Sequence, residues 1–386
     1  MKYLSILLLV TILFGCQKDE NDIPEPVYPL FVIVVEEGLY NGIKENLDTY
    51  INETARGDSS AKVILWPSNG TALQLRDTIN GLYNEHFILG AFLIGNLPFV
   101  RYEMDNWDKH EEFPSDLYFS SPNTNWYDND QDNMYDGYSS LNVKYFVSRI
   151  QGGSTEINSY LNKVHFYRTS VSQTIQKRAY LFVDNEWADF YAGEKFGINS
   201  IYSDVLIDID TNLTTMGKYE NVLSGSGAEY VMQLIHASNS TLFFEHNGDY
   251  ETMSIASMTM LNPKARFYNL FDCSACKYDE DNLGMSYVMS TSYGLAVMGT
   301  TKTGGNYYPQ SFNLALAGGK TWGESFVKWW RTSSSSLDDK WYMGLVIFGD
   351  PMLTITKTAK GNEGFKAYLP LNSIVLDESM RKSNFR

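Results

Sequence analysis

The stretch "LFVIVVEE", residues 30–37, is a run of apolar, mostly β-branched residues that ends in two carboxylates. A continuously apolar run of this length is typical of a strand that is buried on both faces of a sheet. A helical pattern at about 40–55 and a second apolar run, "KVILWP" at 62–67, follow it. Strand, helix and strand in this order predict a βαβ unit with parallel strands.

The same alternation continues along most of the chain and predicts an α/β fold. Further strands are expected at 87–99, 143–150, 178–184, 241–245, 266–272, 295–300 and 352–356, and further helices at 71–84, 154–169, 228–237, 283–293 and 309–331. The pattern restarts after Gly152-Gly153, so we expect two similar subdomains, residues 29–152 and 153–357. Residues 101–141, rich in Asp, Asn, Tyr and Ser, are expected to form a long irregular loop, which usually has a function.

The composition sets limits on the partners. Of the 386 residues, 44% are hydrophobic and 15% aromatic, which is enough for a large core. The 30 basic and 46 acidic side chains give a formal net charge of -16. This charge argues against nucleic acid as a partner.

The N-terminal residues indicate export. Lys2 precedes an apolar run that is too short to span a bilayer and has the features of a signal peptide, residues 1–15. The run ends in Leu-Phe-Gly-Cys16, which resembles the lipobox of bacterial lipoproteins and implies that Cys16 carries lipid. An ordinary secretory signal with an incidental cysteine is the alternative.

The segment after Cys16 is expected to link the lipid to the fold. It begins Gln-Lys-Asp-Glu, which resembles the acidic export tag of surface lipoproteins in the Bacteroidetes. That resemblance implies an outer-membrane or cell-surface lipoprotein of a Gram-negative bacterium. Residues 16–28 carry charge and prolines and are predicted to form a tether, and residues 358–386 a C-terminal tail.

Two kinds of reactive side chain follow predicted strands late in the chain. "TLFFEHNG" places His246 after the strand expected at 241–245, and "YNLFDCSAC" places Cys273 and Cys276 after that at 266–272. Ligands bind at the carboxyl ends of parallel strands in open sheets. If these two strands are neighbours, an imidazole and a thiol open onto one crevice. This pairing favours nucleophilic catalysis, because a thiolate attacks and a histidine moves its proton.

These residues resemble the gingipain-like cysteine peptidases of the caspase-fold clan, in which one strand ends in His-Gly and a later one in Ala-Cys or Ser-Cys. Here "EHNG" and "SAC" occupy those places. Further segments match in order: "LIGNLPF" (93–99), "SDLYFS" (115–120), "VKYFVSRI" (143–150), "GKTWGESF" (319–326) and "FGDPMLTI" (348–355). The resemblance covers about residues 29–356 and implies a caspase/gingipain-like αβα sandwich with a mainly parallel sheet.

The resemblance also implies the roles of site residues. Cys276 is the implied nucleophile and His246 the group that protonates the departing amine. The backbone N–H groups of Cys276 and Gly248 are the implied oxyanion donors, each typically worth about 3 kcal/mol. Glu245 is not expected to orient His246, because consecutive strand residues point to opposite faces.

The sequence departs from the family pattern at two places. Asn247 separates the histidine from the glycine, and Ser148 stands where the family has glycine before Arg149. We find no counterpart of the acidic residue that gives gingipains their preference for basic side chains, so the substrate preference stays open.

The two neighbouring thiols allow other interpretations. Cys273 and Cys276 form a C-x-x-C pair, which suggests redox work in a reducing compartment, although export argues against it. A zinc site needs two more ligands, and only His246 offers itself. A disulfide in so short a loop would inactivate the nucleophile until reduced. Cys273 is the alternative attacker.

The remaining histidines are expected to be packing or surface residues. They are His86, His110, His165 and His236. Unlike His246, they are not matched with a cysteine that follows another predicted strand. His165 and His236 fall in predicted helices.

The acidic loop "DNDQDNMYD" is a candidate calcium site. It places carboxylates or a carbonyl at alternating positions, from Asp128, Asp130, Asp132, Met134 and Asp136. Hard oxygen ligands at this spacing suit calcium, although the glycine and glutamate of an EF-hand are missing. We expect a structural ion and no organic cofactor. A solvated acidic loop without an ion is the alternative.

The sequence therefore predicts a lipid-anchored cysteine endopeptidase that acts on proteins or peptides and meets the membrane only through its lipid. The alternative is a catalytically inactive surface lipoprotein of the same fold that binds protein or glycan. The aromatic side chains of the long loop would form its binding surface, from Tyr118, Trp126, Tyr127, Tyr135 and Tyr138.

Overall fold

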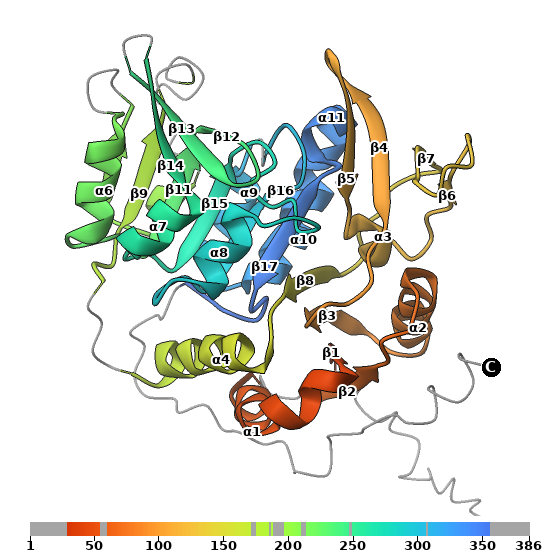
Figure 1. The fold of residues 1–386 in the computed structure, drawn as a ribbon. Coiled ribbons are helices and arrows are strands. Elements are labelled where there is room, and N and C mark those ends of the chain that lie inside the picture. The colour runs from red at the N-terminus through yellow and green to blue at the C-terminus, as the bar shows by residue number, and fades with distance from the viewer. Residues whose placement is uncertain are drawn as a thin grey trace, which may run out of the picture.

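The computed structural model describes residues 29–54, 60–170, 175–184, 187, 197–209, 214–246, 249–305 and 308–355. It contains a ten-stranded, mostly parallel sheet in the order β10-β9-β11-β15-β16-β17-β8-β3-β1-β2, with helices packed against it (Figure 1). The predicted α/β class is therefore confirmed. The signal peptide, Cys16 and the tether lie outside the described residues, as does the C-terminal tail.

The first half of the sheet is built by the chain up to residue 150. Its four strands are parallel: β1 (Leu30–Glu36), β2 (Ser60–Trp66), β3 (Ile88–Ile94) and β8 (Phe146–Ile150). The predicted boundary between subdomains coincides with the end of β8 and the start of α4 (Ser154–Thr169). The sheet itself does not end there, because β8 pairs with the last strand, β17 (Leu345–Gly349).

The second half of the sheet runs in the opposite direction. Its parallel strands are β9 (Ala179–Val183), β10 (Val205–Asp208), β11 (Tyr230–Leu234), β15 (Phe267–Phe271) and β16 (Ala296–Thr300). β17 is antiparallel to β16 and parallel to β8. The strands of the two halves therefore point in opposite directions within one continuous sheet, and their carboxyl ends lie at opposite ends of the strand axis.

Helices cover both faces of each half, which is compatible with an αβα sandwich. In β1, Phe31, Ile33 and Val35 join the core cluster that contains α1 (Glu37–Thr54), whereas the alternate residues join the cluster that contains α2 (Ala72–Glu85). In β15, Tyr268 stacks on Tyr287 of α8 (Leu283–Met289). Its neighbour Phe267 stacks on Trp322, the first residue of α10 (Trp322–Ser333). This burial of both faces explains the continuously apolar strands.

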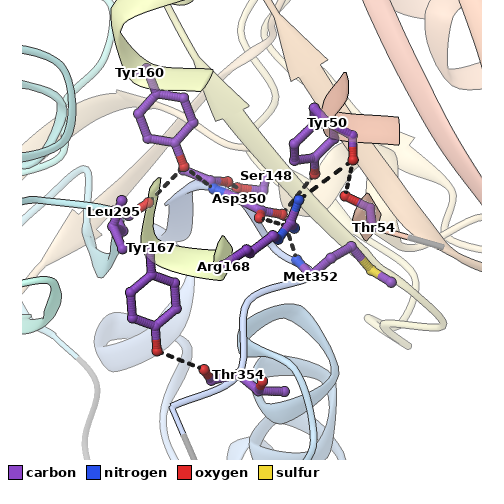
Figure 2. Close-up of polar contacts among 11 residues, drawn as sticks. Tyr50, Thr54, Ser148, Tyr160, Tyr167, Arg168, Leu295, Asp350, Met352 and Thr354 are labelled. Atoms are coloured by element: carbon purple, nitrogen blue, oxygen red, sulfur yellow. Dashed lines mark hydrogen bonds and ion pairs between the residues drawn. The ribbon is translucent and has the colours of Figure 1, made fainter. Parts of the chain in front are cut away.

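A buried polar cluster ties the end of β17 to α1 and α4 (Figure 2). The carboxylate of Asp350 accepts hydrogen bonds from the Tyr50 hydroxyl at 2.7 Å and the Met352 N–H at 2.9 Å, and it pairs with Arg168. The Tyr160 hydroxyl accepts from the Asp350 N–H and donates to the carbonyl of Leu295. Asp350 is fully buried, so these partners supply the hydrogen bonds that water would otherwise make.

The segment 101–141 is more regular than predicted. It contains the hairpin β4–β5 (Arg101–Asn106 and Lys109–Pro114), the short helix α3 (Leu117–Ser120), and the two-residue strands β6 (Trp126–Tyr127) and β7 (Gly137–Tyr138). The hairpin forms a sheet of its own, which Figure 1 shows outside the main sheet. The acidic loop is the segment between β6 and β7.

Three predictions for the second half were wrong. Residues 230–234 form the central strand β11, where a helix was expected. The strand expected at 241–245 exists as β13 (Thr241–His246), but it pairs antiparallel with β12 (His236–Ala237) and β14 (Asp249–Ser254) and not with the main sheet. The last strand lies at 345–349 and not at 352–356.

The remaining described helices are α6 (Met216–Ser224), α7 (Ile255–Leu261), α9 (Gln310–Ala317) and α11 (Asp339–Tyr342), with short 3-10 turns at Ile198–Ser200 and Ser334–Ser336. None of the helices in the described part of the chain is both long and apolar enough to cross a bilayer.

Candidate functional site

His236 and Cys273 follow two strands that lie side by side in the main sheet. β11 and β15 are parallel, and Leu234 at the end of β11 pairs with Phe271 at the end of β15. His236 and Cys273 therefore each lie two residues beyond the last paired position of neighbouring strands. Since neighbouring strands are about 4.8 Å apart, this register brings an imidazole and a thiol to the same edge of the sheet.

Both residues line one cleft of about 640 Å³. Its aromatic walls are formed by Trp107, Trp187, Phe271 and Trp341. The Trp187 ring lies 5.6 Å from that of His236 and 5.3 Å from that of Phe271. Two basic and two acidic side chains, from Lys109, Lys277, Glu111 and Glu280, also face the cleft. The mixture of flat apolar walls and a few charges is typical of sites that bind organic ligands or peptides.

The buried carboxyl of Asp272 joins the two strand ends. It accepts from the Ile235 N–H at 3.1 Å and from the Gln233 side-chain amide at 2.5 Å. Gln233 in turn accepts from the hydroxyl of Tyr219. Because Ile235 precedes His236 and Asp272 precedes Cys273, one side chain holds the two backbones that carry the imidazole and the thiol.

Burial raises the pKa of Asp272 to about 8, and the two hydrogen bonds from β11 only partly oppose this shift. The carboxyl is therefore largely protonated at neutral pH. A neutral group is the form that a dry environment favours.

Cys273 lies in a tight turn. The N–H of Ala275 donates to the carbonyl of Asp272, and Ser274 has φ of +59°, in the left-handed region. Non-glycine residues rarely adopt this conformation, and local strain of this kind often occurs at functional sites. The turn leaves the Cys273 side chain partly exposed in the cleft.

The electrostatic surroundings keep Cys273 in its thiol form at rest. Burial raises the pKa of the Cys273 thiol, and a hydrogen bond from the Gly304 N–H opposes this shift. The amine of Lys302 also opposes it, but burial lowers the pKa of Lys302 to about 8. A base is therefore needed to generate the thiolate near neutral pH, and His236 lies in the same cleft.

Cys276, the nucleophile expected from the resemblance, is fully buried. A Cβ atom added to Gly284 or Gly299 would lie 2.4 or 2.5 Å from its sulfur, so the two glycines shape a space for this side chain. Burial raises the pKa of its thiol well above the ordinary value. Its N–H, expected to hold an oxyanion, already donates to the carbonyl of Thr300 at 2.9 Å. The expectation that Cys276 opens onto the crevice is therefore wrong.

His246 lies at the end of β13, in the small antiparallel sheet and not beside β15. The expected adjacency of the strands before His246 and Cys276 is therefore wrong. Asn247 and the predicted oxyanion residue Gly248 lie outside the described residues, so no role can be assigned to them from geometry.

His236 was missed because its strand was interpreted as a helix. "YVMQL" mixes two residues that favour strands, Tyr230 and Val231, with residues that favour helices, includes the polar Gln233, and is buried at all five positions. A polar residue in a buried strand is tolerated only where it is hydrogen-bonded, and here the partners are Tyr219 and Asp272. The run of turn-forming residues Ser238-Asn239-Ser240, which begins two residues after His236, was the available sign that an element ends there.

The acidic loop brings three of its predicted carboxylate ligands together. Carboxylate oxygens of Asp128, Asp130 and Asp132 lie within 4.8 Å of one another. Asp130 and Asp136 also form such a group with Glu103, a residue of β4 that sequence analysis missed. These oxygens are the hard ligands that calcium prefers.

Glu103 supports the fit to a cation. The residue is buried. Removal from water and the negative charges of Asp132 and Asp130 raise its pKa, whereas a hydrogen bond with His110 lowers it. Bound calcium would relieve this repulsion. The loop carboxylates also accept hydrogen bonds from the backbone. Asp128, for example, accepts from the N–H groups of Gln131 and Asn133.

Two of the other histidines lie at the surface in ion pairs. His110 contacts Glu103 and Asp105, and His165 contacts Glu53. Neither lines the cleft that contains Cys273.

No family model matches the chain, and no curated protein matches it.

We predict that Asp272→Asn changes how stability depends on pH. The raised pKa means that the folded state binds this proton more tightly than the unfolded chain, whose Asp has a pKa near 3.9. The stabilisation of the folded state that this proton provides is complete below about pH 4 and is lost as pH rises through about 8. Between pH 5 and 7 the free energy of unfolding of the wild type should fall, through this group, by up to about 1.4 kcal/mol per pH unit.

Urea unfolding of both proteins at pH 5, 6 and 7 measures this slope. The asparagine can keep the Ile235 contact, and the Gln233 amide can rotate to accept from it. The variant should therefore lack this component of the slope, and identical slopes would contradict the role of Asp272.

Proposed function

We propose that the protein is a lipid-anchored, cell-surface cysteine endopeptidase in which Cys273 is the nucleophile and His236 the proton carrier. The observation that carries the proposal is that these two residues follow adjacent parallel strands and line the same cleft. Cys276 cannot meet a bound substrate without rearrangement, because its side chain is fully buried.

The proposed reaction proceeds by acyl transfer. His236 takes the proton of the Cys273 thiol, and the sulfur attacks the carbonyl carbon of the peptide bond. The imidazolium then gives its proton to the departing amine as the C–N bond breaks, which leaves an acyl-enzyme. Water hydrolyses this thioester, with His236 as base, and restores the thiol. The raised pKa of the resting thiol makes the base necessary.

The substrate class that fits the cleft is a polypeptide. The walls of Trp107, Trp187 and Trp341 offer large flat apolar surfaces, and the hydrophobic effect favours their contact with side chains of a substrate. Lys277 and Glu280 form an ion pair at 2.7 Å at the rim. This cleft is less acidic than expected for a site that selects only basic residues.

The resemblance to the gingipain-like peptidases and their caspase-type fold remains part of this proposal. The mostly parallel sheet with helices on both faces is compatible with it, and His236 and Cys273 follow two neighbouring parallel strands of that sheet. The motifs on which the resemblance was stated contain His246 and Cys276 instead. His236 is followed by Ala237 and Cys273 is preceded by Asp272, so neither residue of the proposed pair lies in the family motif.

The second candidate is an inactive member of the same fold that binds protein or glycan. Its support is a separate hollow of about 660 Å³, lined by Tyr118, Trp126 and Tyr135 beside Asp128. The rings of Tyr118 and Tyr135 stack at 5.4 Å. Aromatic faces of this kind suit sugars or apolar side chains. The high pKa of the Cys273 thiol also agrees with this alternative.

Lipid attachment at Cys16 and a structural calcium ion complete the proposal. The lipid is supported by the sequence before Cys16, and the ion by the convergence of Asp128, Asp130 and Asp132. Calcium would hold the acidic loop beside the aromatic hollow and take no part in bond cleavage. No organic cofactor and no nucleic acid are part of the proposal.

We expect a biotinylated iodoacetamide to label Cys273 and not Cys276 in the folded, reduced protein. Cys273→Ala should abolish labelling, whereas Cys276→Ala should label at the wild-type rate. Because burial raises the pKa of the thiol, labelling should accelerate as pH rises above neutral. Loss of labelling only in Cys276→Ala would reverse the assignment.

Hydrolysis of denatured casein tests catalysis itself. Cys273→Ala and His236→Ala should each lower the rate by about 10³-fold or more, as loss of a nucleophile or its base does in other peptidases. Cys276→Ala serves as the control. Labelling at Cys273 without any hydrolysis by the wild type would favour the binding protein.

Calcium at 10 mM should stabilise the protein by about 1–3 kcal/mol if the site has the millimolar to submillimolar affinity of extracellular modules. Asp130→Asn should remove this gain, because Asp130 belongs to both acidic groups. Asp77→Asn, which removes an exposed charge on α2, is the matched control. Thermal unfolding with calcium or with a chelator measures the difference, and an equal gain in both variants would exclude this site.

Cys16→Ser should move the protein from the membrane fraction to the soluble fraction of the cells that produce it. A retained signal peptide is the competing cause of membrane association. Mass spectrometry of the mature N-terminus separates the two, and an unmodified Cys16 in the wild type would refute the lipid anchor.

A further inference from the structure

Three neighbouring strands of the main sheet carry a reactive or charged residue at the same level. β11, β15 and β16 are adjacent and parallel. His236 and Cys273 each lie two residues beyond the ends of β11 and β15, and Lys302 lies two residues beyond the end of β16. The pairing of Phe267 with Ala296 sets the register that brings Lys302 level with Cys273. The three residues therefore lie in a row at one end of the sheet, with Cys273 in the middle.

Local contacts place Lys302 beside the turn that carries Cys273. The N–H of Ser274 donates to the carbonyl of Lys302 at 2.8 Å. A Cβ atom added to Gly304 would lie 3.7 Å from the Lys302 Nζ, and Gly304 is also the residue whose N–H bonds to the Cys273 sulfur. The ammonium group and the sulfur therefore both lie close to Gly304.

The side chain of Lys302 is a buried cation. The residue is only 1% exposed. Its Nζ atom donates to the carbonyls of Thr303, at 2.6 Å, and Lys340, and it lies 5.8 Å from the centre of the Trp107 ring. Within the described part of the chain, no carboxylate forms an ion pair with it. Two carbonyls use only two of the three N–H donors of a lysine, so this buried charge attracts a further anionic partner.

The charged groups that act on Lys302 come from three elements. Burial lowers the pKa of Lys302 to about 8, against the attraction of Glu111 in β5, of Cys273 after β15, and of the pair Asp339 and Asp338 at the start of α11. The amine is therefore mostly protonated at neutral pH and carries its charge when a thiolate forms beside it. The titratable side chains that line the cleft together with Cys273 are Lys109, Glu111, His236, Lys277 and Glu280.

Lys302 and Glu111 act on Cys273 with opposite signs. Burial raises the pKa of the Cys273 thiol, Asp272 and Glu111 raise it further, and the Gly304 N–H and Lys302 lower it. The Glu111 carboxylate accepts from the N–H and the hydroxyl of Thr303 at 3.1 and 2.5 Å, which fixes its position. This opposition offers a matched pair of variants.

We propose that the Lys302 ammonium is the counter-charge of the Cys273 thiolate, supplied by the third strand of the row. Lys302 is a positioning residue, because it acts through Cys273 and is too buried to touch the substrate. When His236 takes the thiol proton, the negative charge forms on a sulfur that lies between its base and a fixed cation, so little rearrangement of water is needed. This inference rests on the proposed function, because it assigns a partner to the proposed nucleophile.

The rate at which iodoacetamide alkylates Cys273 tests the inference in the full-length, reduced protein. Measured from about pH 6 to about pH 10, this rate follows the thiolate fraction, and peptide mass spectrometry separates Cys273 from Cys276. Lys302→Gln keeps N–H donors for the two carbonyls but removes the charge, so the midpoint should rise by about one pH unit or more. Glu111→Gln should lower it. An unchanged midpoint in folded Lys302→Gln would overturn the inference.

Control variants separate charge from packing. Lys328→Met removes an exposed charge of α10 and should leave the midpoint unchanged. The rise caused by Lys302→Gln should persist in the His236→Ala background, because the ammonium acts on the sulfur directly. A rise in both Lys302→Gln and Glu111→Gln would indicate disturbed packing and overturn the inference, as would an equal rise in Lys328→Met.

Position 273 provides the test if Lys302→Gln does not fold. With Lys302 in place, Cys273→Asp puts a negative charge where the thiolate would form. At pH 7 this variant should unfold at a higher temperature than Cys273→Asn, because the ammonium favours the charged form. The reverse order would overturn the inference.

The inference and the proposed function can fail separately. If the wild type does not hydrolyse casein but Lys302→Gln and Glu111→Gln shift the midpoint in opposite directions, the proposed function fails and the counter-charge stands. If Cys273 and His236 prove essential for hydrolysis but Lys302→Gln leaves the midpoint unchanged, the proposed function stands and this inference fails.

Discussion

The position of the candidate site depends on one buried carboxyl. Asp272 is the last residue before Cys273, and it holds the backbone immediately before His236. β11 and β15 stop pairing at Leu234 and Phe271. Beyond these residues, the Asp272 contact continues to link the two segments of chain. The interaction is strong because it is shielded from water, but the same shielding makes the charged form of the Asp272 carboxyl unfavourable. The site is therefore built around a group that prefers to stay neutral.

The two cysteines illustrate how the environment separates identical side chains. Cys273 sits on a strained turn at the mouth of a cleft, and Cys276 lies three residues later in a space shaped by Gly284 and Gly299. The first has the imidazole of His236 in its cleft, and the second is fully buried. Reactivity of a thiol follows its exposure and its neighbours more than its place in a motif.

Much of the fold could be predicted from the sequence, because many elements carry local signals. α4 was predicted at its observed bounds, and β1 and α2 within about two residues, because a continuous apolar run marks β1 and apolar residues at helical spacing mark the two helices. β11 could not be recognised, because Gln233 becomes compatible with a buried strand only through partners outside it, Tyr219 and Asp272, the second of them 39 residues later. The histidine of the candidate site was lost with it, whereas the acidic loop was found because its ligands are close in sequence.

The insertion of β17 between β16 and β8 has a consequence for the order of folding. β8 is complete at residue 150, yet one of its edges has no partner until residues 345–349 arrive from almost two hundred positions further along the chain. Contacts so distant in sequence form slowly, and an open strand edge invites pairing with other chains. During synthesis, the first half of the molecule therefore depends on the last strand to close it.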